Sequence, residues 1–177
     1  YGLGKQGLKS LLGEGTVKPD SERSQAFLFY QRGDIMAGSI TGELIRVSNQ
    51  NQGRPSIAKL VLTCVADADA ATFPATVLND LQTAHRIEGL QLYSIKTIPG
   101  DTAPTADSDI TITDEYGVDL LGGKGTNLIS DTAKKWALFG PQNYTASALI
   151  TGDVTINIAN NSVKSAEITV VIELLGV

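Results

Sequence analysis

The chain contains few of the side chains that most enzymes use for proton transfer or nucleophilic attack. Histidine is the side chain most often used in general acid–base catalysis, yet His85 is the single histidine among 177 residues. No sequence signature pairs it with Cys64, the single cysteine, as a nucleophile. We expect His85 to be a surface or interface residue, and we expect no enzymatic activity and no catalytic residue.

The single cysteine also excludes a disulfide within the chain. Cys64 lies in an apolar, strand-like run, where a cysteine usually packs as a small core hydrophobe. Folding then depends on the burial of apolar side chains alone, which is compatible with a reducing cytoplasm.

Positive charge is scarce as well. The chain has 14 Lys and Arg against 19 Asp and Glu, a net charge of −5 and a pI near 4.8. Because nucleic-acid affinity depends on clustered Lys and Arg, we expect no nucleic-acid partner. Charged residues make up 19% of the chain, below the average of about 25%, which leaves uncharged and apolar groups on the surface to contact protein neighbours.

Long apolar runs are missing. No run approaches the ~20 residues that cross a bilayer, and the first residues lack the apolar stretch of a signal peptide. We expect a soluble chain with no membrane partner.

Three glycine-containing strings match known motifs in their letters but not in their context. Residues 2–7 have the glycine spacing of a dinucleotide-binding loop, which also needs a strand before it and a helix after it. Residues 122–126 resemble a phosphate-binding loop but have Gly where Ser or Thr should follow the lysine, and we interpret them as a turn. Residues 32–34 spell Arg-Gly-Asp, and Gly-Asp is also a common turn. We expect no cofactor.

Several acidic residues could supply the hard oxygen ligands that calcium prefers, but the EF-hand spacing is absent. Asp also collects in turns because its side chain accepts hydrogen bonds from nearby backbone N–H groups. We expect turns and no metal at these residues, which are Asp67, Asp69, Asp107, Asp109, Asp114, Glu115 and Asp119.

Strand-like patterns dominate the chain after a polar loop that ends at Pro55. Residues 56–65 are mostly apolar and rich in β-branched side chains, which indicates a central strand. Residues 90–98 stop at a Pro-Gly turn, residues 109–113 alternate, and a further short strand is expected at 118–121. Short strands at this spacing predict an all-β fold, an antiparallel β-sandwich of Ig-like or jelly-roll-like type with an extended N-terminal arm.

Two rows of alternating apolar residues lie near the C-terminus, at 154–158 and 168–174. A loop of turn formers at 160–165 separates them, so we expect a hairpin. Helical periodicity is weak, and its best candidates are the short segments 75–82 and 130–138.

The expected domain organisation has three parts. Residues 1–24 form an N-terminal arm with five glycines, residues 25–55 form a β-hairpin or extended segment that packs on the core or on a neighbour, and residues 56–177 form the β-sandwich domain. Within the second part, residues 35–47 are expected to form two short strands or one bulged strand.

Apolar and aromatic residues outside the expected core are candidates for protein contacts, because aromatic side chains contribute much of the energy of interfaces. For the arm the alternative is plain terminal disorder, and for Trp136 it is a place in the core. The interface candidates are Leu3, Leu8, Leu11, Leu12, Phe27, Phe29, Tyr30, Trp136 and Tyr144.

Residues 90–131 carry a series of short patterns. A strand is followed by Pro-Gly, an Ala-Pro-Thr loop, an Asp-Ile-Thr-Ile strand and then Gly-Val-Asp-Leu-Leu-Gly-Gly. This series resembles virion structural proteins of tailed bacteriophages. The resemblance covers the C-terminal two thirds at most, from about residue 56, and consists of turn and strand residues.

The resemblance implies a β-sandwich protein of the phage particle, in particular a capsid decoration (cement) protein that clamps major capsid subunits. Its implied partners are the major capsid protein and copies of itself, often as a trimer, and its implied place is the capsid surface after synthesis in the host cytoplasm. Two alternatives stay open: a tail or head–tail adaptor component, and a carbohydrate- or cell-binding β-sandwich that uses Trp136 or Tyr144 as a stacking platform.

Overall fold

A computed structural model describes residues 37–46, 57–81, 87–139 and 148–176. All of them belong to one compact unit, Met36–Val177, and the unit Tyr1–Ile35 lies outside the described residues. The expected N-terminal arm therefore lies outside them too. The elements of the described part are β1 (Ser39–Arg46), β2 (Ile57–Val65), β3 (Thr76–Val77), the 3-10 helix η1 (Leu78–Leu81), β4 (Leu90–Pro99), β5 (Asp109–Thr113), β6 (Lys135–Leu138), β7 (Thr155–Ala159) and β8 (Glu167–Gly176).

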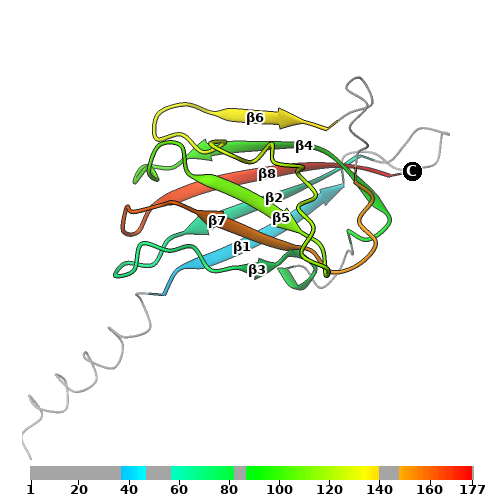
Figure 1. Ribbon diagram of the computed structural model, residues 1–177, viewed down its shortest axis with the longest axis horizontal. Helices are drawn as coiled ribbons and strands as arrows, with labels where there is room; N and C mark the ends of the chain where they lie inside the picture. Colours follow the sequence, from blue (N-terminus) through cyan, green and yellow to red (C-terminus); the bar gives the residue numbers. More distant parts are fainter. Residues whose placement is uncertain (1–36, 47–56, 82–86, 140–147, 177) are drawn as a thin grey trace, which may run out of the picture. The chain divides into compact units, whose positions relative to one another are not determined.

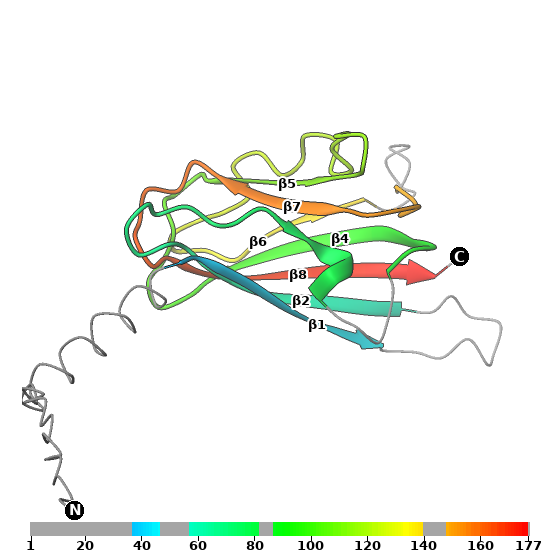
Figure 2. The same cartoon turned by 90° about the horizontal axis from the view of Figure 1, so that it is seen from below.

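The strands form two antiparallel sheets that pack face to face (Figures 1 and 2). The five-stranded sheet has the order β1-β2-β8-β4-β6, and the three-stranded sheet has the order β3-β7-β5. The predicted all-β antiparallel sandwich is thereby confirmed. From β2 onward each strand lies in the opposite sheet from the strand before it, which is the chain path of a jelly roll rather than of an Ig-like sandwich.

The core lies between the sheets and is built by period-2 alternation in the strands. In β8, Ile168, Val170, Ile172 and Leu174 are all buried, and they face the buried isoleucines of β5 and β7. Full burial of one such side chain contributes about 1.5–3 kcal/mol to stability, so these rows hold the two layers together.

The two C-terminal apolar rows do not form the expected hairpin, and that prediction is wrong. Residues 155–159 are β7 of the three-stranded sheet, whereas residues 167–176 are β8 of the five-stranded sheet. The loop between them crosses from one layer to the other, where the Asn161 side-chain amide donates to the carbonyl oxygen of Ala71 at 2.6 Å. Alternation shows which face of a strand is buried but not which strand lies beside it.

The strand expected at 118–121 also differs from the structure, and the two weak helical candidates do not form α-helices. Residues 118–121 make one isolated bridge, Thr113↔Asp119, and then enter a series of turns. The helical candidate 75–82 is helical only as the single turn η1, and the candidate 130–138 ends in β6, because its last four residues pair with β4.

β1 is one regular strand that pairs with β2 over its full length, so the sandwich includes residues 39–46 as well as the predicted domain from 56 onward. Gly42 lies opposite Leu62, and a Cβ at this position would be 2.7 Å from the Leu62 Cδ2 atom. The glycine therefore leaves room for a core leucine without a bulge.

Candidate protein-docking face

The candidate site is the outer face of the five-stranded sheet, on the side away from the three-stranded sheet. In the part of the chain that the structure describes, no strand or helix packs on this face (Figure 2). The strand register arranges its side chains in rows across the sheet. The central row consists of Glu43, Val61, Val171, Lys96 and Trp136.

A network of charged and polar side chains lies in the middle of the face. Glu173 Oε2 accepts a hydrogen bond from the Ser94 hydroxyl at 2.6 Å, and Glu173 Oε1 accepts one from Lys96 Nζ at 2.7 Å. Lys59 Nζ lies 3.9 Å from the same Oε1 atom. A register shift between Leu92 and Ser94 sets Ser94 opposite Glu173. Because the Glu173 carboxylate already has partners, covering it with a neighbouring protein would cost less desolvation free energy than covering an unpaired carboxylate.

The hydrogen bonds from Lys96 and then Ser94 lower the pKa of Glu173 below its ordinary value of 4.5. The pairing therefore stabilises the fold above that value, and the stabilisation is lost as the pH falls through the lowered pKa. We expect Glu173→Gln to reduce the free energy of unfolding at pH 7 by roughly 1–2 kcal/mol. The difference from wild type should shrink toward zero in acid, as measured by urea unfolding at pH 7 and pH 3.

Glu167→Gln is the matched control for this prediction, because Glu167 is an exposed carboxylate on the same strand. It should change the free energy of unfolding by less than about 0.5 kcal/mol at either pH. A Glu173→Gln variant as stable as this control at pH 7 would show that the network contributes nothing.

Exposed apolar side chains gather on the outer face. Six large hydrophobic residues are exposed in the described part of the chain, and four of them lie on this face or at its edge. Trp136 is 63% exposed at the end of the central row. Ile57 and Leu149 lie on a second row, which Leu175 and Gln91 complete, and Ile45 lies opposite Lys59.

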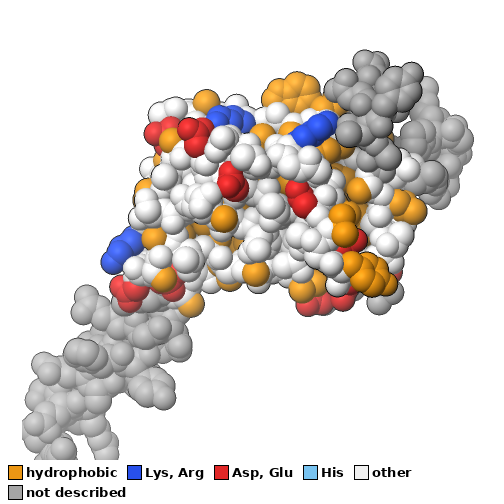
Figure 3. Space-filling model, viewed as in Figure 1, with side chains coloured by type: hydrophobic (Ala, Val, Ile, Leu, Met, Phe, Trp, Pro, Cys, Tyr) orange, Lys and Arg blue, Asp and Glu red, His pale blue; other side chains and the backbone are white. Residues whose placement is uncertain are grey.

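The outer face of the three-stranded sheet is different. Its outward positions include Thr111, Thr113, Thr155 and Asn157, which are polar and uncharged. Figure 3 looks onto this side and shows a mostly polar surface with separate charged side chains and scattered hydrophobic ones. The exposed apolar surface of the sheets is thus one-sided, which is the arrangement expected of a protein that docks through one sheet.

An open groove lies at the β6 edge of the outer face. Ile98 and Trp136 supply its apolar surface, and Lys96, Lys134 and Lys135 complete its lining around a volume of about 440 Å³. Lys135 Nζ donates to Asp107 Oδ1 at 3.1 Å and to the Asn127 carbonyl oxygen at 2.8 Å. Hydrophobic atoms project from this edge in Figure 3, beside Lys or Arg atoms. We call this feature the Trp136 groove.

The segment that resembles phage virion proteins forms β4, the following loop, β5 and the turns after it. Its glycines and aspartates have structural roles here: Gly122 and Gly123 have positive φ angles, and Asp119 accepts hydrogen bonds from the N–H groups of Leu121 and Gly123. Comparisons with protein-family models, curated proteins and solved structures gave no match to this chain. The resemblance stays a hypothesis that rests on these residues alone.

The groups considered for chemistry that lie in the described part of the chain are Cys64 and the acidic residues. Within the described ranges, no set of three or more His, Cys, Asp and Glu residues is arranged to hold a metal ion. Cys64 is buried, and desolvation raises the pKa of its thiol to about 12. Asp67 accepts hydrogen bonds from the N–H groups of Ala70 and Asp69, and these bonds lower the pKa of its carboxyl. No helix in these ranges has the length and apolar character of a membrane span.

The predicted interface residues divide into two groups. Trp136 projects from the surface, so the alternative that placed it in the core is wrong, and its contact with a partner stays a prediction. The other candidates and His85 lie outside the described residues; those candidates are Leu3, Leu8, Leu11, Leu12, Phe27, Phe29, Tyr30 and Tyr144.

The sequence reasoning missed the outer-face residues Val61, Val171 and Leu175. A signal for Val171 and Leu175 was present, since Val170-Val171 and Leu174-Leu175 are adjacent apolar pairs in which one member must point away from the core. Such pairs are typical of strands that are covered on both faces.

Proposed function

We propose that this chain is a non-enzymatic structural protein that docks onto neighbouring protein subunits through the outer face of its five-stranded sheet. The observation that carries the proposal is the one-sided exposure of apolar rows around a charged network that is already paired. An isolated sheet face of this kind exposes Trp136, Ile45 and Ile57 to water, and a partner would remove that apolar area from solvent.

Within this class, we propose a decoration protein of a tailed-phage capsid, which clamps major capsid subunits at the particle surface. The support is the pattern at residues 90–131 together with the jelly-roll path of the chain. Jelly rolls also occur in lectins and cupins, so the fold is compatible with this role but does not distinguish it from others. A tail or adaptor component would use the same face on a different part of the particle.

A second candidate function follows from the exposed indole of Trp136. An aromatic ring in an open groove with lysine donors beside it can stack on a sugar ring, which would make the chain a carbohydrate-binding module. Trp136→Ala would then abolish binding on a glycan array.

Trp136 is the single tryptophan of the chain, so its fluorescence reports directly on this edge of the face. We expect a blue shift of its emission and weaker quenching by acrylamide when shells of major capsid protein are added. The chain should be used at a dilution at which its own emission no longer depends on concentration. Unchanged emission with shells would contradict capsid docking, and a shift with glycans alone would favour the carbohydrate-binding module.

A further inference from the structure

The turn at residues 114–118 presents the other two exposed large hydrophobic residues of the described surface. Tyr116 is 82% exposed and Val118 is 58% exposed. Both are held by Asp114, whose Oδ1 atom accepts hydrogen bonds from the N–H groups of Tyr116 at 3.0 Å and Val118 at 2.8 Å. The backbone of Asp114 also pairs with Gly117 and Val118. The turn is therefore preorganised, and a partner that binds it has little chain entropy to remove.

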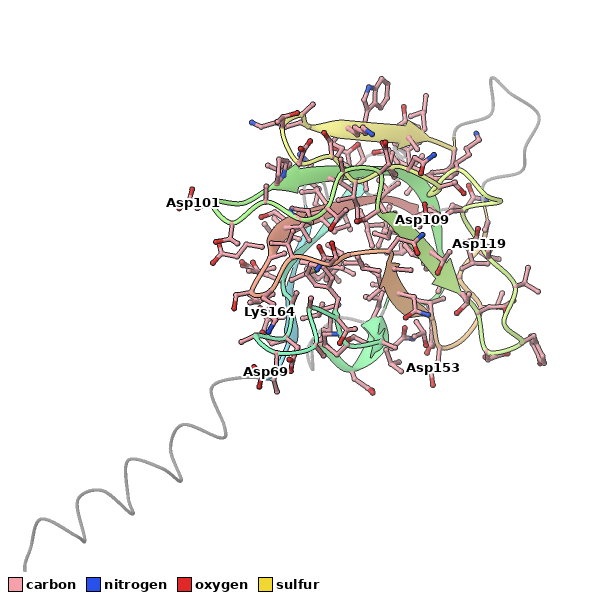
Figure 4. The ribbon with its side chains drawn as sticks, turned by 60° about the vertical axis from the view of Figure 1, so that its left-hand side comes forward. Asp69, Asp101, Asp109, Asp119, Asp153 and Lys164 are labelled. Atoms are coloured by element: carbon pink, nitrogen blue, oxygen red, sulfur yellow. The ribbon has the colours of Figure 1, made fainter. Side chains whose placement is uncertain are left out.

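Acidic side chains surround this apolar turn. Asp114 and Glu115 belong to it, Asp119 follows it directly, and the Glu115 carboxylate lies against Gly152, the neighbour of Asp153. Asp119 and Asp153 lie at the same end of the sandwich in Figure 4. The turn thus combines an exposed aromatic ring with a rim of negative charge.

The Trp136 groove has the complementary chemistry. It offers the apolar surfaces of Trp136 and Ile98, and its rim carries Lys96, Lys134 and Lys135. Lys96 Nζ already pairs with Glu173 and Lys135 Nζ with Asp107, so the exposed Lys134 is the main cation that the groove offers to a partner. An acidic partner with an exposed aromatic side chain would pair both the charges and the apolar surfaces.

We propose that the Trp136 groove receives the 114–118 turn of a second copy of this chain, so that copies associate head to tail. Ile98 is three residues before Asp101, and Val118 directly precedes Asp119. Figure 4 shows Asp101 and Asp119 at opposite ends of the sandwich, so a copy cannot fill its own groove. A head-to-tail contact makes a closed ring or an open filament, according to the rotation at each contact.

This inference deepens the proposed function, on which it rests for the use of the β6 edge as a docking surface, but it can be tested without a capsid. Cys64 is buried, so it should not compete with an introduced surface cysteine during mild oxidation. Two full-length variants, Lys134→Cys in the groove and Val118→Cys in the turn, are purified, mixed and mildly oxidised. Lys164→Cys replaces Lys134→Cys in the control mixture, because Lys164 is an exposed lysine in a loop of the same sandwich.

The expected result is a disulfide-linked heterodimer that forms in the mixture of Lys134→Cys with Val118→Cys and at least about tenfold less in each variant alone. A mixture that gives no more heterodimer than the Lys164→Cys control overturns the inference. Efficient linkage of Lys134→Cys to itself also overturns it, because two grooves would then face each other. Neither result affects the fluorescence test with capsid shells.

Charge exchange supplies an independent test of the same contact. Sedimentation velocity should show that Lys134→Glu and Glu115→Lys each weaken self-association about tenfold. The double variant should recover self-association, because each contact then pairs opposite charges again. A double variant weaker than both single variants would contradict the proposed pairing.

Discussion

Val171→Glu is expected to weaken the proposed docking onto capsid shells at least about 100-fold while the sandwich stays folded. Val171 lies at the centre of the outer face, between Val61 and Lys96 in the central row. A carboxylate there would be buried in the interface with the partner. Its desolvation free energy would exceed its favourable interaction with a nearby lysine. Co-sedimentation of the variant with capsid shells measures the loss.

Thr111→Glu is the matched control, since Thr111 is an outward residue in the middle of β5 on the opposite sheet. Both variants should unfold within about 1 kcal/mol of wild type, because each new side chain points to solvent in the free protein. Thr111→Glu should keep full docking. If both variants lost capsid binding equally, or if Thr111→Glu alone lost it, the docking surface would not be the outer face of the five-stranded sheet.

Gly125→Ala is expected to reduce the free energy of unfolding by about 3 kcal/mol. The carbonyl oxygen of Gly125 accepts a hydrogen bond from the Ile110 N–H at 3.0 Å, so the turn after β5 folds back onto the edge of that strand. An added Cβ would overlap the backbone carbonyl oxygen of Ile110 and crowd Leu121. Neither backbone nor core can move away cheaply, and urea unfolding measured by circular dichroism should show the loss.

Gly123→Ala separates this effect from ordinary backbone strain. Gly123 has a φ angle of 80° and no atom near the place of an added Cβ. It should therefore cost only about 1–2 kcal/mol, the penalty of a left-handed conformation for an L-residue. If Gly125→Ala were no worse than Gly123→Ala, the close approach to β5 would be wrong. If Gly125→Ala costs more than Gly123→Ala, close packing against β5 explains why a glycine stands at residue 125, and no phosphate ligand is needed to explain it.

The sequence predicted the strands that have a strong apolar or alternating pattern. Residues 56–65, 90–98 and 109–113 correspond to β2, β4 and β5, and the apolar run of β2 was correctly interpreted as a central strand. Each of these segments buries one full row of side chains, so its apolar and β-branched content is visible without knowledge of its neighbours.

The sequence did not predict which strands pair. The loop at 160–165 has the composition of a hairpin turn, but its strands belong to different sheets, because Asn161 and the residues near it bond to the chain at Ala71 and Thr105. Contacts so distant in sequence leave no local pattern. The same holds for the candidate site: Trp136 was recognisable as an aromatic residue, but the row that joins it to Val171 and Val61 exists only through the order of the strands.

An electron cryo-microscopy map of phage capsids mixed with this chain would test the proposed docking face most directly. The account predicts that density of a neighbouring subunit covers β2, β8, β4 and β6 on their outer side, with Val171 and Trp136 within the contact. A map in which that side faces solvent, and in which the threonine-bearing side of β5 and β7 meets the neighbour instead, would contradict it.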